Sequence, residues 1–366
     1  MRLAARRIQP ALLGEVRILP QYEKPAADAY DRLTKPLFCG SKDYWKIGNT
    51  FDTMTDYLLH SNRQSEGPKL AGQVFDVYDN AKNTSAAWYD DFAWWGIACS
   101  KAFDPDYKDI FGADKIQHFQ TIAVSDPFNC NLGPFQNTVM NALYLTLALR
   151  LQQLLGAGGT EQGKAAELEY GFLRDWIDLT KEFDNALLYP FGNGSLVRER
   201  VATYAALNGK FPPVNGYDKN ATWLGDQGLM LAAMAEYHNL HPTAGALDLA
   251  DKLWRGAFDT FKGRALEPTL NWSVGDNREG EDYDFGRGVF WRSVFHAFNR
   301  SQPMALKIRT SIREERDNFV YRSAEEACNT QLPEKVANGD ENKALCLAFN
   351  VLATLTAADA IRVWMG

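Results

Sequence analysis

Apolar residues recur at the 3.6-residue spacing of an α-helix through most of this chain, whereas strand-like alternation is rare. The segments with helical spacing cover residues 50–61, 85–103, 136–155, 162–184, 225–239, 243–263, 284–299, 302–320 and 341–364. The Pro-, Gly- and Asn-rich stretches between them read as loops rather than as a linker between domains. We therefore predict one all-α domain over residues 1–366, with residues 1–40 forming an irregular N-terminal segment.

The predicted helices are of two kinds that alternate along the chain. One kind sets polar residues into a mostly apolar surface, whereas the other, at 162–184, 243–263 and 302–320, carries more charge, as the outer member of a helical hairpin would. Helices of the first kind start near residues 50, 88, 137, 225, 287 and 342. Six such inner helices predict a closed double ring, the (α/α)6 toroid. A looser helical array is the alternative.

Composition narrows the range of partners. The chain has 39 Lys and Arg against 46 Asp and Glu, so it offers no strongly basic surface for nucleic acid or an anionic membrane. Apolar runs such as residues 142–149 are much shorter than the ~20 residues of a spanning helix. We expect a monomer with no nucleic acid partner and no membrane span.

The N-terminus and the cysteines leave the cellular location open. The first twenty residues contain four arginines and no long apolar stretch, unlike an intact secretory signal. We expect a secreted or cell-surface protein from which a signal has been removed, with an intracellular protein as the alternative. Five widely spaced cysteines without a C-x-x-C pair exclude a zinc ribbon and allow at most two disulfides. The histidines follow no ligand pattern and no nucleotide-binding loop is present, so we expect neither metal nor cofactor.

The candidate chemistry lies at two adjacent carboxylates, Asp90 and Asp91, which stand among Trp88, Tyr89, Trp94 and Trp95. Two acids close together do not ionise equally, and a glycosidase needs this division, because one group protonates the leaving oxygen while the other attacks or activates water. Flat aromatic rings also suit the C–H faces of sugars. The structural alternative is that the acids begin a helix and the tryptophans belong to the core.

The stretch from Asp90 to Trp95, Asp-Asp-x-x-Trp-Trp, resembles the signature of glycoside hydrolase family 76, the endo-α-1,6-mannanases. Three later segments resemble family segments in the same order, namely Asn137-Thr-Val-Met-Asn141, Trp223-Leu-Gly-Asp226-Gln227-Gly and Phe285-Gly-Arg287-Gly-Val-Phe-Trp-Arg292. The resemblance spans about residues 45–355. It implies an (α/α)6 barrel and a retaining enzyme, with Asp90 as nucleophile and Asp91 as general acid/base.

The match has two departures. Asp226 stands where the family usually has asparagine, and Arg287 where it usually has lysine, so the substrate need not be α-1,6-mannan. Because neighbouring side chains on a helix diverge by about 100°, we also predict that the acid pair lies at a loop-to-helix junction or beside a narrow cleft.

The side chains selected as sugar contacts are Tyr89, Trp94, Trp95, Asn141, Asp226, Gln227, Arg287 and Asp52. Each has a structural alternative. Burial is the default for the tryptophans, and helix capping is as good an account of Asp226 and Gln227. Asn141 could tether a helix or loop, and Asp52 could line the cleft or cap a helix. Arg287 could pair with the acids at 279–284.

The sequence thus predicts a glycoside hydrolase acting on α-1,6-mannan or a related α-linked glycan. A transglycosylase, in which a second sugar replaces water, would use the same residues. A non-catalytic glycan-binding toroid would keep the aromatic residues but has no need of both acids. A sugar epimerase on the same architecture is a further alternative, but it would want histidines facing the cleft.

Overall fold

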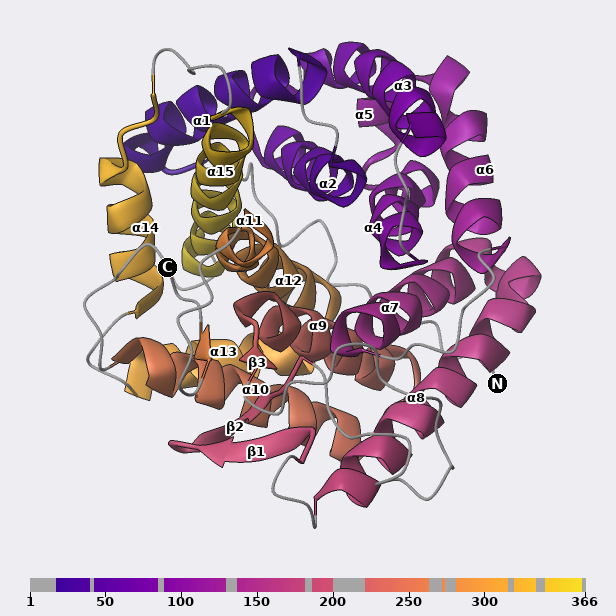
Figure 1. The fold of residues 1–366 in the computed structure, drawn as a ribbon, viewed down its shortest axis with the longest axis vertical. Coiled ribbons are helices and arrows are strands. Elements are labelled where there is room, and N and C mark those ends of the chain that lie inside the picture. Colours follow the sequence, from indigo (N-terminus) through magenta and orange to yellow (C-terminus); the bar gives the residue numbers. More distant parts are fainter. Residues whose placement is uncertain are drawn as a thin grey trace.

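The computed structural model describes residues 18–39, 43–84, 89–129, 137–181, 186–199, 221–262, 272–273, 281–314, 319–333 and 340–363. Six helices form an inner ring: α2 (Tyr44–His60), α4 (Tyr89–Ser100), α7 (Thr138–Leu155), α9 (Leu224–Leu240), α12 (Gly286–Arg300) and α15 (Glu341–Val363). Each packs against the next, and α15 packs against α2, so the ring closes (Figure 1).

The outer helices pack on the outside of this ring (Figure 1). They are α1 (Pro20–Cys39), α3 (Gly67–Thr84), α6 (Ala113–Asn129), α8 (Thr160–Thr180), α10 (Ala244–Lys262), α13 (Gln302–Glu314) and α14 (Phe319–Asn329). Helices α13 and α14 together occupy the sixth outer position, where the sequence predicted one helix over 302–320. The predicted (α/α)6 toroid is confirmed.

The two rings differ in the way the sequence predicted. In α9, an inner helix, every residue from Leu224 to Tyr237 is buried, because neighbours surround it. In α10, an outer helix, Ala246, Ala250, Leu253 and Trp254 follow helical spacing and form one buried stripe. An inner helix is therefore buried on nearly all sides, polar residues included, whereas an outer helix is amphipathic.

The irregular segment predicted over 1–40 is wrong for its second half, since residues 20–39 form α1. Pro20 takes the first helical position, which needs no backbone N–H donor. The buried stripe of Tyr22, Ala26, Ala29, Tyr30 and Leu33 has helical spacing and packs on the ring.

Short elements connect the helices. They are the helices α5 (Lys108–Phe111) and α11 (Glu281–Asp284), the 3-10 turns η2 (Gln64–Glu66), η3 (Lys101–Phe103) and η4 (Gly156–Gly159), and the strands β1 (Leu188–Phe191), β2 (Gly194–Val197), β3 (Ala221–Thr222) and β4 (Trp272–Ser273). The strands form two antiparallel pairs, β1 with β2 and β3 with β4.

Among the described residues, the stretch Glu341–Arg362 of α15 is long and apolar enough to cross a membrane. In this structure 83% of its most apolar window is buried. Its apolar surface is covered by α1, α2, α12 and α14, so the toroid accounts for the hydrophobicity of this helix.

Candidate active site at the inner-helix N-termini

The predicted acid pair lies in the first turn of α4, which begins at Tyr89. Asp90 is half-buried and Asp91 is buried. The positive end of the helix dipole favours carboxylates in this turn. The pair therefore sits where the chain enters an inner helix. Trp88 and the side chain of Tyr89 lie outside the described residues.

Four aromatic rings from different parts of the chain meet beside this turn, and we call them the aromatic layer: Trp45, Trp94, Trp223 and Phe285. The Trp45 ring is the centre of the group, at 5.9 Å from Trp94, 6.2 Å from Trp223 and 5.4 Å from Phe285 between centroids. Trp45 is half-buried, whereas the other three are buried. The layer joins the N-terminal ends of α2, α9 and α12 to the first turns of α4.

Trp45 was not among the residues selected from the sequence. It is one of ten tryptophans, and no motif marks it. One feature of the sequence could have identified it. Three aromatic residues each lie within one residue of an inner-helix N-terminus, namely Trp45, Trp223 and Phe285. Aromatic residues at equivalent ends of parallel helices converge when the ring closes.

Trp95 was selected as a sugar contact, but the structure places it in the core. Its side chain is fully buried, and its indole Nε1 donates a hydrogen bond to the Tyr44 carbonyl oxygen at 2.8 Å. Its ring packs against Tyr44, Phe51 and Tyr78 from α2 and α3. Of the two adjacent tryptophans, Trp94 is therefore the one that belongs to the aromatic layer.

Beneath the aromatic layer lies a buried set of ionisable residues, which we call the charge layer: Asp52, Asp56, Lys101, Arg150, Glu236, Arg292 and His296. The Lys101 ammonium lies 2.7 Å from Asp52 Oδ1 and 2.6 Å from Asp56 Oδ1. Arg150 pairs with Glu236 at 2.8 Å, and Arg292 pairs with Asp52. Three acids thus face three bases, and the layer is neutral when His296 is neutral.

Asp52 was expected to line a cleft or cap a helix, and it does neither. Helix α2 begins at Tyr44, earlier than the predicted start near residue 50, so Asp52 lies in the middle of the helix and is fully buried. Although burial opposes its ionisation, Lys101 and Arg292 hold the pKa of Asp52 well below its usual range.

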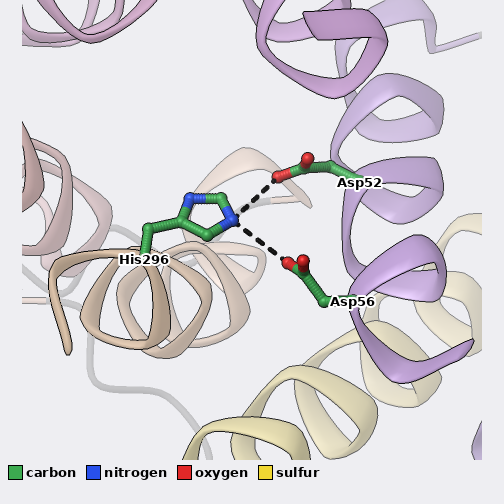
Figure 2. Close-up of side chains that lie close together, drawn as sticks. All are labelled: Asp52, Asp56 and His296. Carbon is green, nitrogen blue, oxygen red and sulfur yellow. Dashed lines mark hydrogen bonds and ion pairs between the residues drawn. The ribbon is translucent and has the colours of Figure 1, made fainter. Parts of the chain in front are cut away.

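Asp52, Asp56 and His296 each offer one possible metal-ligand atom, and these atoms lie within 4.8 Å of one another. Figure 2 shows the imidazole pointing toward both carboxylates. Their neighbours argue against a metal there. The Arg150 guanidinium lies 2.9 Å from His296 Nδ1 and can only donate, so Nδ1 accepts and the ring proton is on Nε2. His296 Nε2 then donates to Asp56 Oδ2 at 3.1 Å and has no lone pair for a metal.

The same contacts explain the ionisation of His296. Burial, followed by the Arg150 charge, lowers the pKa of His296 to about 4. A second proton would have to enter at Nδ1, against the guanidinium. The Lys101 ammonium already occupies the position between the two carboxylates. This trio is therefore part of a closed network of ion pairs.

Gln227 and Asn141, both selected as sugar contacts, are bonded to backbone. Gln227 Nε2 donates to the Val197 carbonyl at 2.7 Å, while its Oε1 accepts from the Val197 N–H at 2.8 Å. Gln227 thus fastens β2 to the start of α9. Asn141 Nδ2 donates to the Asn137 carbonyl at 2.6 Å, in the first turn of α7.

The two remaining selected residues sit in opposite settings. Asp226 is fully buried in the first turn of α9. Arg287 lies in α12, and its Nη2 donates to Glu326 on the outer helix α14 at 3.0 Å. The structural alternative paired Arg287 with the acidic run at 279–284, but among the described residues its ion pair is with Glu326. The arginine of α12 that reaches the charge layer is Arg292.

No family model matches this chain, and no curated protein sequence matches it. Solved structures do match. The α-1,6-mannanase GH76A from Salegentibacter sp. HEL1_6 aligns over 93% of this chain and 99% of its own, with 16% identity and a TM-score of 0.58. An inactive variant of that enzyme in complex with α-1,6-mannotriose aligns over 92% of this chain and 99% of its own, with 15% identity and a TM-score of 0.57.

Dfg5 from Chaetomium thermophilum, in complex with glucosamine, aligns over 94% of this chain and 90% of its own, with 15% identity and a TM-score of 0.62. These alignments cover nearly the whole toroid in each protein. At such identities the likeness establishes architecture rather than activity. The resemblance first seen in four sequence motifs is therefore confirmed at the level of the fold: this chain folds as the GH76 α-1,6-mannanase structures do.

Proposed function

We propose that this protein is a retaining glycoside hydrolase that acts on α-1,6-mannan or a related α-linked glycan. The observation that carries the proposal is the adjacent pair Asp90 and Asp91 in the first turn of an inner helix, beside a half-buried tryptophan. Its fold is that of α-1,6-mannanase structures. Two acids and an aromatic surface are the groups that glycoside hydrolysis needs.

In the first step, a carboxylate oxygen of Asp90 attacks the anomeric carbon of the sugar. The glycosidic C–O bond breaks, and Asp91 gives its proton to the departing oxygen, which leaves a glycosyl ester on Asp90. In the second step, water attacks the anomeric carbon, Asp91 takes a proton from it, and the ester bond breaks. Two inversions return the sugar to its original anomeric configuration.

Trp45 and Trp94 are the aromatic residues we assign to this site. Trp45 keeps part of its surface exposed, as a ring that stacks on a sugar must. Trp94 lies under it, within the aromatic layer. Tyr89 remains a proposed sugar contact, since it begins the helix that presents both acids. Gln227, Asn141 and Asp226 are proposed to shape the neighbouring helix ends.

The test is the turnover of α-1,6-mannan oligosaccharides, and of a panel of other α-linked glycans, by Asp90→Asn and Asp91→Asn. We expect each variant to lose about a thousandfold or more in kcat while remaining folded, because each removes a reacting group. Asp109→Asn, which changes an exposed acid on α5, should retain full activity. Full turnover by both variants of the pair would exclude the assignment.

The products separate the remaining functions. Hydrolysis gives shorter glycans only, whereas longer glycans would identify a transglycosylase that uses the same acid pair. Azide distinguishes the two roles. It should restore turnover of an activated glycoside to Asp91→Ala and give the retained glycosyl azide, whereas rescue of Asp90→Ala should give the inverted one. Glycan binding by the wild type without turnover would instead identify a binding protein.

A further inference from the structure

The side chain directly below the acid pair is Trp94. On α4 it follows Asp90 by four residues and Asp91 by three, and both spacings place side chains next to each other on a helix surface. Trp94 is buried, so its position is fixed by packing. Whatever sets the position of this indole also sets the orientation of the turn that carries the acids.

The ring of Trp94 is held from across the toroid. The Arg292 guanidinium lies 5.0 Å from its centroid, a cation–π contact between α12 and α4. These two helices are not neighbours in the inner ring, since α2 and α7 flank α4. The contact therefore joins the acid-bearing helix to a distant wall of the ring.

Arg292 is itself fixed. Its Nη1 donates to Asp52 Oδ2, and the other oxygen of Asp52 faces the Lys101 ammonium. All three side chains are buried. A guanidinium bonded in this way has little rotational freedom, so it can act as a rigid support for the indole.

From this chain of contacts we infer that Arg292 is a positioning residue, which aligns Asp90 and Asp91 by supporting Trp94. The inference rests on the proposed function. A retaining mechanism requires the two carboxyl groups to be about 5–5.5 Å apart, yet adjacent residues on a helix diverge. A small rotation of the first turn of α4 moves both carboxyl groups relative to the bound sugar, and misplacement by about 1 Å can cost a hundredfold in rate.

A double-mutant cycle on kcat tests the inference, with Arg292→Met, Trp94→Phe and the double variant. We expect Arg292→Met to lower kcat by about ten- to a hundredfold and to change KM by less than about threefold. Because Arg292 acts through Trp94, the double variant should be no slower than the slower single variant. Arg292→Lys retains the charge without the planar fork and should recover part of the loss.

Arg300→Met is the matched control. Arg300 lies on the same helix and is paired with a buried acid, Asp104, but it is not stacked on Trp94. We expect its loss to lower stability and leave the kcat of the folded enzyme unchanged. The inference would be overturned if the fall in kcat of the double variant equalled the product of the two single falls. It would also be overturned if Arg300→Met lowered kcat as much as Arg292→Met does.

Hydrogen exchange tests the same contact without any turnover. We expect Arg292→Met to lower the protection of the α4 amides over residues 93–98 by at least about tenfold relative to α8, and Arg300→Met to leave this ratio unchanged. If the protection of α4 relative to α8 were the same in Arg292→Met and Arg300→Met, Arg292 would not support α4. If the wild type turns over no glycan, the proposed function fails, and the exchange result still decides whether Arg292 supports α4.

Discussion

At the scale of single residues, the charge layer shows how one neighbour determines the protonation of another. Arg150 cannot accept a hydrogen bond, so the His296 nitrogen that faces it must. The imidazole is therefore neutral, with its proton directed at Asp56. Three acids and three bases can then share a buried space without a net charge. Ionised groups in such a place are costly unless each has a partner.

This arrangement predicts a pH dependence of stability that His296→Gln removes. The folded pKa of His296, about 4, lies below its ordinary value of 6.5. The contribution of neutral His296 to the unfolding free energy is thus complete above pH 6.5, and it is lost as the pH falls through 4. Between pH 7 and pH 4 the unfolding free energy of the wild type should fall by up to about 3 kcal/mol more than that of the variant.

Urea titrations of both proteins at several pH values measure this difference. Subtracting the variant cancels the titration of the groups that do not interact with His296. A difference that stays constant from pH 7 to pH 4 would show that His296 is not held in its neutral form.

At the scale of elements, the inner helices are packed closely enough to require glycine. A Cβ added at Gly228 of α9 would lie 2.7 Å from the Phe290 Cα of α12 and 2.9 Å from its carbonyl oxygen. Backbone atoms cannot move aside as a side chain can. The two helices therefore approach to a distance that only glycine permits at this position.

Gly228→Ala should accordingly lower the unfolding free energy by roughly 2–3 kcal/mol. Gly171→Ala is the control, because Gly171 lies inside α8 with no atom within 4 Å of an added Cβ. There alanine should stabilise the protein by about 0.5–1 kcal/mol, through its better helix propensity. Chemical denaturation of the two variants measures both effects. If both substitutions raised the unfolding free energy by the same amount, α9 and α12 would not be in close contact at Gly228.

The elements were largely predictable from sequence, and their contacts were not. Apolar spacing identified all six inner helices, because this signal is local. The partners in the charge layer are far apart in sequence, with Asp56 and His296 separated by 240 residues, and meet only when the ring closes. Of the two arginines, we selected Arg287 rather than Arg292 for the site. Side chains five residues apart on a helix point in directions that differ by roughly 140°, so the two arginines face different helices.

At the scale of the whole molecule, the first and last described helices complete the toroid together. Helix α1 packs on α15 and α2, and the Leu19 N–H donates to Asp359 Oδ1 of α15 at 2.8 Å. Each inner helix thus has a neighbour on both sides. An open array would lack this, since its end helices could separate on their own.

Because the ring is closed, we expect a substitution that destabilises α1 to lower the stability of every inner helix. Leu33 is fully buried on α1, so Leu33→Ala should cost about 2–5 kcal/mol. In native-state hydrogen exchange, the free energy of opening should fall by the same amount for the slowest-exchanging amides of α9 and of α15. Leu168→Ala, at an exposed position on α8, should change neither. Unchanged protection in α9 would show instead that the seam between α1 and α15 opens independently.

The meeting of Trp45 with Trp223 has a consequence for any polymer bound by this protein. The two rings come from α2 and from the start of α9, on opposite sides of the ring, and they touch at its middle. Among the described residues, the middle of the toroid is thus filled by these rings and by the charge layer beneath them. On the proposed function, a glycan would therefore bind at the face that holds the inner-helix N-termini rather than pass through the ring.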